Sequence, residues 1–152
     1  MTENFSELTF EQIKIDQTKE FQIKITESLV DEFAKLSGDF SPIHMDDEYA
    51  KSTKFKGRVV HGMLLASFLS RMVGMYMPGK HALYTSQSLE FPHPCFIDDE
   101  ITVSSVVIDK SQSTKIIKIE SKIINKKNEI LLNGVGLSLI HISEPTRPER
   151  IG

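Results

Sequence analysis

The sequence lacks the features of disulfide-rich, membrane-spanning and nucleic-acid-binding proteins. Its 152 residues include one cysteine, Cys95, so no disulfide forms within the chain, and we expect a small buried side chain there. Its apolar stretches fall short of the roughly 20 residues that cross a bilayer, which predicts no membrane association. The net charge is −3 and the lysines are scattered, so we expect no nucleic-acid partner.

Length and termini favour one cytoplasmic domain. A chain of 152 residues suits a single core. The acidic start lacks the basic end and apolar run of a signal peptide, which predicts a cytoplasmic protein. From His141 onward the apolar period is lost. We therefore predict a domain over residues 1–140 and a tail over 141–152 that is disordered or foreign to the domain.

The stretch from His61 to Tyr76 is the centre of the predicted fold. It is apolar on nearly every face, which is typical of a helix buried all round. An earlier helix is predicted to begin after Thr26, a good N-cap, and to end at Gly38. One or two further helical turns are expected over residues 46–51.

Alternation of apolar and polar residues fills most of the remaining chain. A strand or hairpin is expected over residues 10–25, before the first helix. Four later strands are predicted over residues 82–91, 100–109, 114–125 and 129–140. Their short connections predict an antiparallel meander. The pattern predicts an α+β fold in which strands surround one helix.

Asp39 and His44 are the first candidates for chemistry. They lie five residues apart on a turn where Pro42 biases the preceding residue toward extended geometry, so we expect no helix there. A carboxylate and an imidazole together can move a proton onto or off a water molecule. The backbone N–H of Gly62 opens the predicted central helix and suits a carbonyl oxygen that gains charge. By spacing alone, a turn-forming Asp and a structural, hydrogen-bonded His are favoured over a catalytic pair.

A family resemblance favours the catalytic interpretation. The run FAKLSGDFSPIHMD, residues 33–46, resembles the hydratase motif of the MaoC-like, (R)-specific enoyl-CoA hydratase family. The run VHGMLLAS, residues 60–67, is similar to that family's second signature. Ser41 and Val59 depart from the Asn and Pro that the family commonly has, which affects geometry rather than chemistry. The likeness covers about residues 10–140 and implies a hot-dog fold, in which a curved antiparallel sheet wraps one long helix.

The resemblance also implies an activity. It implies the reversible hydration of a trans-2-enoyl thioester, carried by coenzyme A or acyl carrier protein, to the (R)-3-hydroxyacyl thioester. The sequence itself has no metal-ligand spacing of histidines and no glycine-rich phosphate motif, so we expect no metal and no cofactor. Asp39 would be the base toward water, His44 would orient that water and share the proton transfer, and the Gly62 N–H would polarise the carbonyl. A hot-dog thioesterase and a non-catalytic acyl-thioester binding subunit are the alternatives. Four residues are candidates for the acyl pocket, with core packing as the alternative for the first three: Phe40, Met63, Val73 and Ser70.

The remaining expectations concern assembly and lesser candidates. The unpaired edges of a small open sheet, together with the resemblance, predict a homodimer. Ser70 also matches a position where a hydroxyl would hydrogen-bond the catalytic Asp, and His61 is expected to support structure through a hydrogen bond. The basic residues before the central helix, Lys54, Lys56 and Arg58, are expected to form a solvated loop, with coenzyme A phosphates as the alternative ligands.

Overall fold

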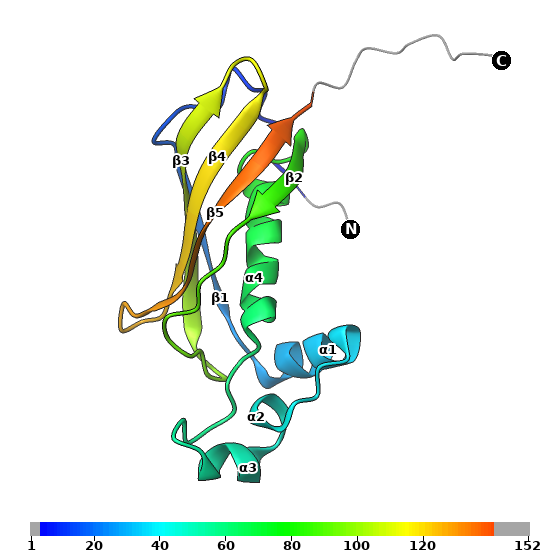
Figure 1. The fold of residues 1–152 in the computed structure, drawn as a ribbon, viewed down its shortest axis with the longest axis vertical. Helices are drawn as coiled ribbons and strands as arrows, with labels where there is room; N and C mark the ends of the chain where they lie inside the picture. Colours follow the sequence, from blue (N-terminus) through cyan, green and yellow to red (C-terminus); the bar gives the residue numbers. More distant parts are fainter. Residues whose placement is uncertain (1–3, 142–152) are drawn as a thin grey trace, which may run out of the picture.

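Five antiparallel strands curve around one helix, α4, in a computed structural model that describes residues 4–141 (Figure 1). The strand order in the sheet is β1-β3-β4-β5-β2. The α+β arrangement predicted from the sequence is confirmed. In chain order the elements are β1 (Thr18–Lys24), α1 (Glu27–Ser37), α2 (Pro42–Met45), α3 (Asp47–Ser52), α4 (Gly62–Arg71), the π-helical turn η1 (Met72–Tyr76), β2 (Ala82–Gln87), β3 (Glu100–Ser111), β4 (Ile116–Ile124) and β5 (Ile130–Ile140).

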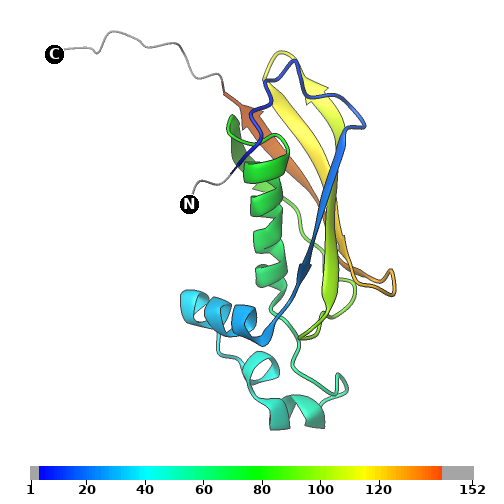
Figure 2. The ribbon, with the colours of Figure 1, turned by 180° about the vertical axis from the view of Figure 1, so that it is seen from behind.

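The main core lies between α4 and the concave face of the sheet. Leu65, Leu69 and Met72 of the helical segment pack against side chains such as Val103 and Ile123 of the sheet, and all are at most 2% exposed. Figure 2 shows that α4 lies along one side of the curved sheet and that α1, α2 and α3 gather at the end where α4 begins. Burial of these apolar side chains holds the N-terminus of α4 at a set place beside the three short helices.

The prediction that the central helix is buried all round is wrong for the single chain. Met63 is 58% exposed, and Ser67, Ser70 and Gly74 follow it on the solvent side of the helical segment. The reason is geometric, because a five-stranded sheet covers only one side of a helix and no other described element covers the opposite side.

The strand predictions are correct for most of the sheet, with two corrections. The meander holds for β3, β4 and β5, but β2 pairs with β5 at the sheet edge instead of with β3. The connection from β2 to β3 contains Pro92 and Pro94, which cannot donate to a ladder, and it crosses to the other side of the sheet. Residues 10–12 and 15–16 form turns in place of a strand, and Phe10 and Ile13 are buried in a second apolar cluster.

Local signals set the helix ends. Thr26 caps α1 by accepting a hydrogen bond from the Leu29 N–H at 3.2 Å, and Gly38 ends the helix at a φ of 80°. Both predicted ends are confirmed. Ser41 is extended, as expected, but Pro42 then opens the short helix α2 in place of the predicted non-helical turn. Proline fits the first position of a helix because the N–H that it lacks has no helical partner there.

Two further expectations have different outcomes. Cys95 is buried at 1% exposure, and this burial raises the pKa of its thiol. The tail predicted for residues 141–152 lies, apart from His141, outside the described residues, so the domain boundary stays a prediction. Across residues 4–141, no helix is long and apolar enough to cross a membrane.

Lys110 joins the N-terminal segment to the sheet. Its ammonium group donates hydrogen bonds to the backbone carbonyls of Phe10 at 2.8 Å and Ile13 at 2.6 Å. The same Nζ atom lies 4.4 Å from the centre of the Phe10 ring, a cation–π distance. The segment before β1 is therefore held by a charged group as well as by its apolar side chains.

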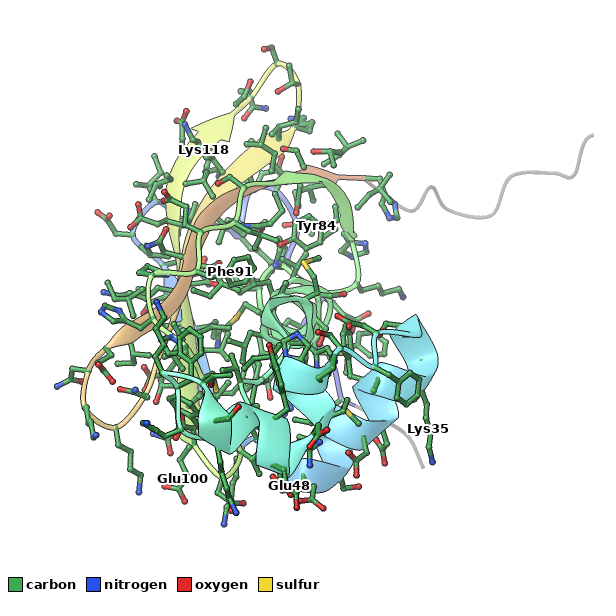
Figure 3. All side chains as sticks on the ribbon, turned by 60° about the horizontal axis from the view of Figure 1, so that its bottom comes forward. Lys35, Glu48, Tyr84, Phe91, Glu100 and Lys118 are labelled. Atoms are coloured by element: carbon green, nitrogen blue, oxygen red, sulfur yellow. The ribbon has the colours of Figure 1, made fainter. Side chains whose placement is uncertain are left out.

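We expect Lys110→Met to lower the free energy of unfolding by about 1–3 kcal/mol, because two carbonyl groups lose a charged donor. Urea denaturation measures this change. Lys118→Met is the matched control, since Lys118 is an exposed lysine of β4 (Figure 3) and its loss should cost less than about 0.5 kcal/mol. Equal losses in the two variants would contradict the assigned role of Lys110.

Candidate active site

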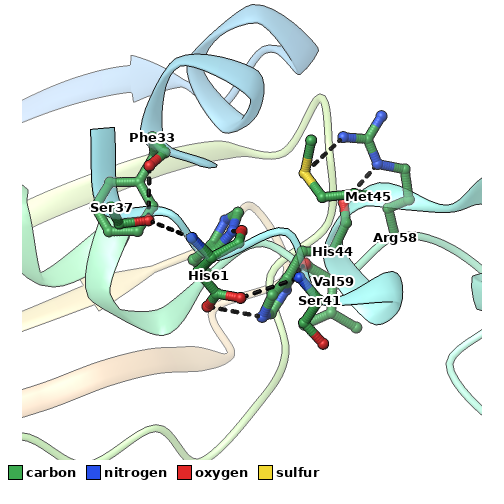
Figure 4. Close-up of polar contacts among 9 residues, drawn as sticks. Phe33, Ser37, Ser41, His44, Met45, Arg58, Val59 and His61 are labelled. Carbon is green, nitrogen blue, oxygen red and sulfur yellow. Dashed lines mark hydrogen bonds and ion pairs between the residues drawn. The ribbon is translucent and has the colours of Figure 1, made fainter. Parts of the chain in front are cut away.

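The turn between α1 and α2 brings Asp39 and His44 together. The Asp39 Oδ2 atom lies 3.9 Å from Nε2 of His44, the residue labelled in Figure 4. The other carboxylate oxygen of Asp39 accepts the Ser41 N–H at 3.1 Å, and the Asp39 N–H donates to the Ser37 hydroxyl at 3.1 Å. The Asp39 side chain is 48% exposed and that of His44 is 17% exposed, so the pair borders solvent. The spacing seen in the sequence thus becomes a spatial pair.

The hydrogen bond at the far side of His44 sets its tautomer. Nδ1 of His44 lies 2.6 Å from the carbonyl oxygen of Val59. Since a carbonyl only accepts, Nδ1 carries the hydrogen, and in the neutral imidazole Nε2 presents a lone pair toward Asp39. Both Asp39 and His44 then offer acceptors to the space between them. Two atoms at this separation can contact the same water at about 2.8 Å each.

Arg58 holds the backbone of His44. Its Nε atom donates to the His44 carbonyl at 2.6 Å, while its two terminal nitrogens lie 3.5 Å from Glu27 and 3.1 Å from Asp31, both on α1. The residue is 8% exposed. For Arg58, the expected solvated loop and the alternative of a phosphate ligand are both wrong, because its guanidinium is committed inside the protein. Sequence reasoning missed that Glu27 and Asp31, one helical turn apart, form a matching pair of acceptors.

His61 is the expected structural histidine, and it contacts both members of the pair. Its Nε2 donates to the Asp39 carbonyl at 2.9 Å. Its ring stacks on the His44 ring with centroids 4.1 Å apart. Burial lowers the pKa of His61, and the nearby His44 and Arg58 act in the same direction, against the raising effects of its hydrogen bond to Asp39 and of the Asp39 charge.

The N-terminus of α4 faces the same region. No side chain caps this helix, and its first residue, Gly62, lines a cavity of about 420 Å³ together with His44. A Cβ atom on Gly62 would lie 2.9 Å from the ring of Phe91, so glycine permits this close contact. Phe91, which sequence reasoning missed, is 45% exposed and lines the same cavity. Its one sequence signal is an aromatic residue just before the Pro92 that ends the strand pattern.

The four predicted acyl-pocket residues lie in different places. Met63 and Ser70 line a second hollow of about 350 Å³, between α4 and β2. Phe40 is 56% exposed beside Asp39, and Val73 is buried at 7% exposure. The described contacts of the Asp39 carboxylate are to Ser41 and His44, and the hydrogen bond suggested for Ser70 is not among them. The physical reason is that Ser70 lies two turns along α4, on its exposed face.

Asp39, His44 and His61 lie close enough together to suggest metal ligands, with candidate ligand atoms within 4.8 Å of one another. Their arrangement fits proton transfer better. The Nε2–H of His61 points at a carbonyl, and the stacked rings of the two histidines, 26° from parallel, do not aim their lone pairs at one point. The expectation of a metal-free site remains a prediction.

Comparisons with known proteins show which family the chain resembles in sequence and in fold. The family described as MaoC like domain matches residues 10–128. The (R)-specific enoyl-CoA hydratase of Aeromonas caviae is 38% identical over 102 residues, which are 67% of this chain and 76% of that protein. A mitochondrial 3-hydroxyacyl-[acyl-carrier-protein] dehydratase of Arabidopsis thaliana is 36% identical over 102 residues, 66% of this chain and 60% of that protein. The solved (R)-hydratase of A. caviae involved in PHA biosynthesis superposes with a TM-score of 0.84 and 31% identity, covering 86% of this chain and 99% of that one.

The lowered pKa of His61 predicts a pH-dependent stability. Below the ordinary value of 6.5, the unfolded chain binds a proton that the buried imidazole does not bind, so the free energy of unfolding falls as the pH falls. One such group contributes a slope of at most about 1.4 kcal/mol per pH unit. Urea denaturation from about pH 7 to about pH 5 should show a shallower fall for His61→Gln than for the wild type. Parallel curves would contradict the buried neutral state.

Proposed function

Because the chain belongs to the MaoC-like family, we propose that Asp39 and His44 are the residues that act on water in its reaction, the reversible hydration of a trans-2-enoyl thioester to the (R)-3-hydroxyacyl thioester. The protein is a hydro-lyase with a hot-dog fold, as its relatives and structural neighbours are. The observation that carries the assignment is the 3.9 Å approach of Asp39 Oδ2 to a His44 nitrogen that bears a lone pair.

The geometry supports a short sequence of steps. A water held between the pair donates to both acceptors, and its oxygen bonds to C3 of the enoyl group as a proton passes to Asp39. The electron pair of the C2–C3 double bond moves toward the thioester carbonyl, whose oxygen gains negative charge. The free N–H of Gly62, at the positive end of α4, stabilises that oxygen. The pair then returns a proton to C2, on the face to which water was added.

The proposed pair also bears on the two alternatives. A pure acyl-thioester binder has no need of an acid/base pair, yet Asp39 and His44 are both present and face each other. A thioesterase would direct the same water to the carbonyl carbon and release a thiol. The products therefore distinguish a thioesterase from a hydratase. Relatives named for coenzyme A and for acyl carrier protein substrates both match this chain, so both carriers are tested below.

The exposed face of α4 supports a homodimer. Strand β2 pairs with β5 on one side only, so its other edge presents unpaired backbone groups. Beside this edge lie Leu83, which is 57% exposed, Met63 and the hollow that Ser70 lines. A second copy placed edge to edge along β2 would pair the free backbone groups and cover these apolar side chains.

We also propose that the protein functions in the cytoplasm, on the basis of the sequence analysis.

We expect the wild-type protein to bleach the enoyl-thioester absorbance of crotonyl-CoA or its acyl-carrier-protein counterpart without releasing thiol. Asp39→Asn and His44→Gln should each lower the rate by about 10²- to 10⁴-fold, since each removes a proton-transfer group while keeping its size. Asp47→Asn, on the exposed start of α3, is the matched control and should keep the wild-type rate. Full activity in either site variant would remove the proposed roles, and thiol release would favour a thioesterase.

The homodimer predicts a mass twice that of the chain in sedimentation equilibrium at micromolar concentration. Leu83→Lys should raise the dissociation constant by about 10-fold or more, because it places charges on an apolar interface. Ile15→Lys changes a residue of similar exposure, 53%, away from the β2 edge and should leave the constant unchanged. A monomeric wild-type protein, or equal effects of the two variants, would exclude this interface.

A further inference from the structure

His61 lies at the junction of every element that forms the site. It is the N-cap residue of α4 and is 2% exposed. Its Nε2–H is bonded to the Asp39 carbonyl, its ring stacks on the ring of His44 with 26° between the two planes, and Phe33 of α1 packs against it edge-on at 5.0 Å. One side chain thus contacts both residues of the catalytic pair without facing the cavity that His44 and Gly62 line.

The two contacts constrain different parts of the pair. The hydrogen bond holds the main chain at Asp39, from which the carboxylate extends, so it restricts where Oδ2 lies. The stacked ring restricts how far the His44 imidazole can tilt, while the Val59 carbonyl sets its rotation. Loss of either contact would let the 3.9 Å separation vary, and a displacement of about 1 Å at a reacting group can cost about 10² in rate.

The chemistry of His61 suits this task. Since its acceptor is a carbonyl, Nε2 carries the hydrogen, and Nδ1 is a buried lone pair with no hydrogen-bond partner among residues 4–141. The charged or titratable groups that face it are His44, Asp39 and Arg58, and burial keeps the imidazole neutral among them. A neutral His61 neither repels a proton that arrives on His44 nor competes for it.

We propose that His61 is a positioning residue of the hydratase, which sets the separation of Asp39 and His44 through its hydrogen bond and its stacked ring. This inference rests on the proposed function of that pair. The role proposed for His61 differs from that proposed for the next residue, Gly62, whose N–H stabilises the thioester carbonyl oxygen.

Three substitutions separate the two contacts. His61→Gln keeps an N–H donor near the position of Nε2, His61→Phe keeps a stacking ring, and His61→Leu keeps neither. We expect His61→Leu to lower kcat by about 10²-fold with KM within about threefold of the wild type, because positioning acts on the reaction step. The Gln and Phe variants should each recover part of this loss. His81→Gln, at a histidine outside the site, is the control and should keep the wild-type kcat.

A second measurement, NMR of the histidine rings, reports on the geometry of the site in the absence of substrate. In protein with ¹⁵N-labelled histidine, NMR should show the Nδ1–H tautomer for His44 and the Nε2–H tautomer for His61. The His44 signals should shift and broaden in the Leu variant and less in the Gln and Phe variants. Unchanged His44 signals in His61→Leu, or a kcat within about threefold of the wild type in that variant, would overturn the proposal. An inactive wild-type protein would instead refute the proposed function, and the NMR result would still decide the role of His61.

Discussion

Four hydrogen bonds join the turn at residues 39–44 to the segment at 58–61, and the site depends on them. The side chain of Arg58 donates to the His44 carbonyl, and that of His61 donates to the Asp39 carbonyl. The His44 ring donates to the Val59 carbonyl, and the Val59 N–H donates to the Ile43 carbonyl at 3.0 Å. The two bonds that involve a histidine ring join residues that are 15 and 22 positions apart in the chain. The proposed proton-transfer pair and the start of α4 are thereby held together, whereas each alone would be an ordinary turn and an ordinary helix end.

The contacts of Arg58 contribute more to the fixed geometry of the site than to the free energy of unfolding. Arg58 is almost fully buried, but the side chains of its partners Glu27 and Asp31 are 66% and 44% exposed. Solvent screens such half-exposed pairs, so their contribution to the free energy of unfolding is modest. The guanidinium fixes the orientation of these segments, because its planar donors contact the two carboxylates and the His44 carbonyl at once. These contacts therefore hold α1, α2 and the entry to α4 in one arrangement, which the proposed proton transfer requires.

Features that depend on neighbours in the sequence could be predicted, and those that depend on distant partners could not. Thr26 and Gly38 bound α1 through contacts within one helical turn. Asp39 and His44 lie five residues apart, so their spacing in the sequence predicted that they would be close. Arg58 resembled a solvated basic loop because its two acceptors lie 27 and 31 residues earlier in the chain. The pairing of β2 with β5 was missed for the same reason, because alternation marks a strand but does not name its neighbour. Phe91 became visible only through its contact with Gly62.

The apolar pattern of α4 differs from its burial in the single chain, and this difference has a physical explanation in the proposed dimer. A helix that faced solvent on one side would carry polar residues there, yet that side of α4 carries Met63, Ala66 and small residues. Small and apolar side chains beside an unpaired strand edge suit close approach of another backbone. Burial of this face in the proposed dimer would account for the apolar pattern, whereas within one chain only the sheet-facing side of α4 is buried. The same surface borders the hollow lined by Ser70, so a partner that covers it would also complete the wall of any acyl chain that lies there.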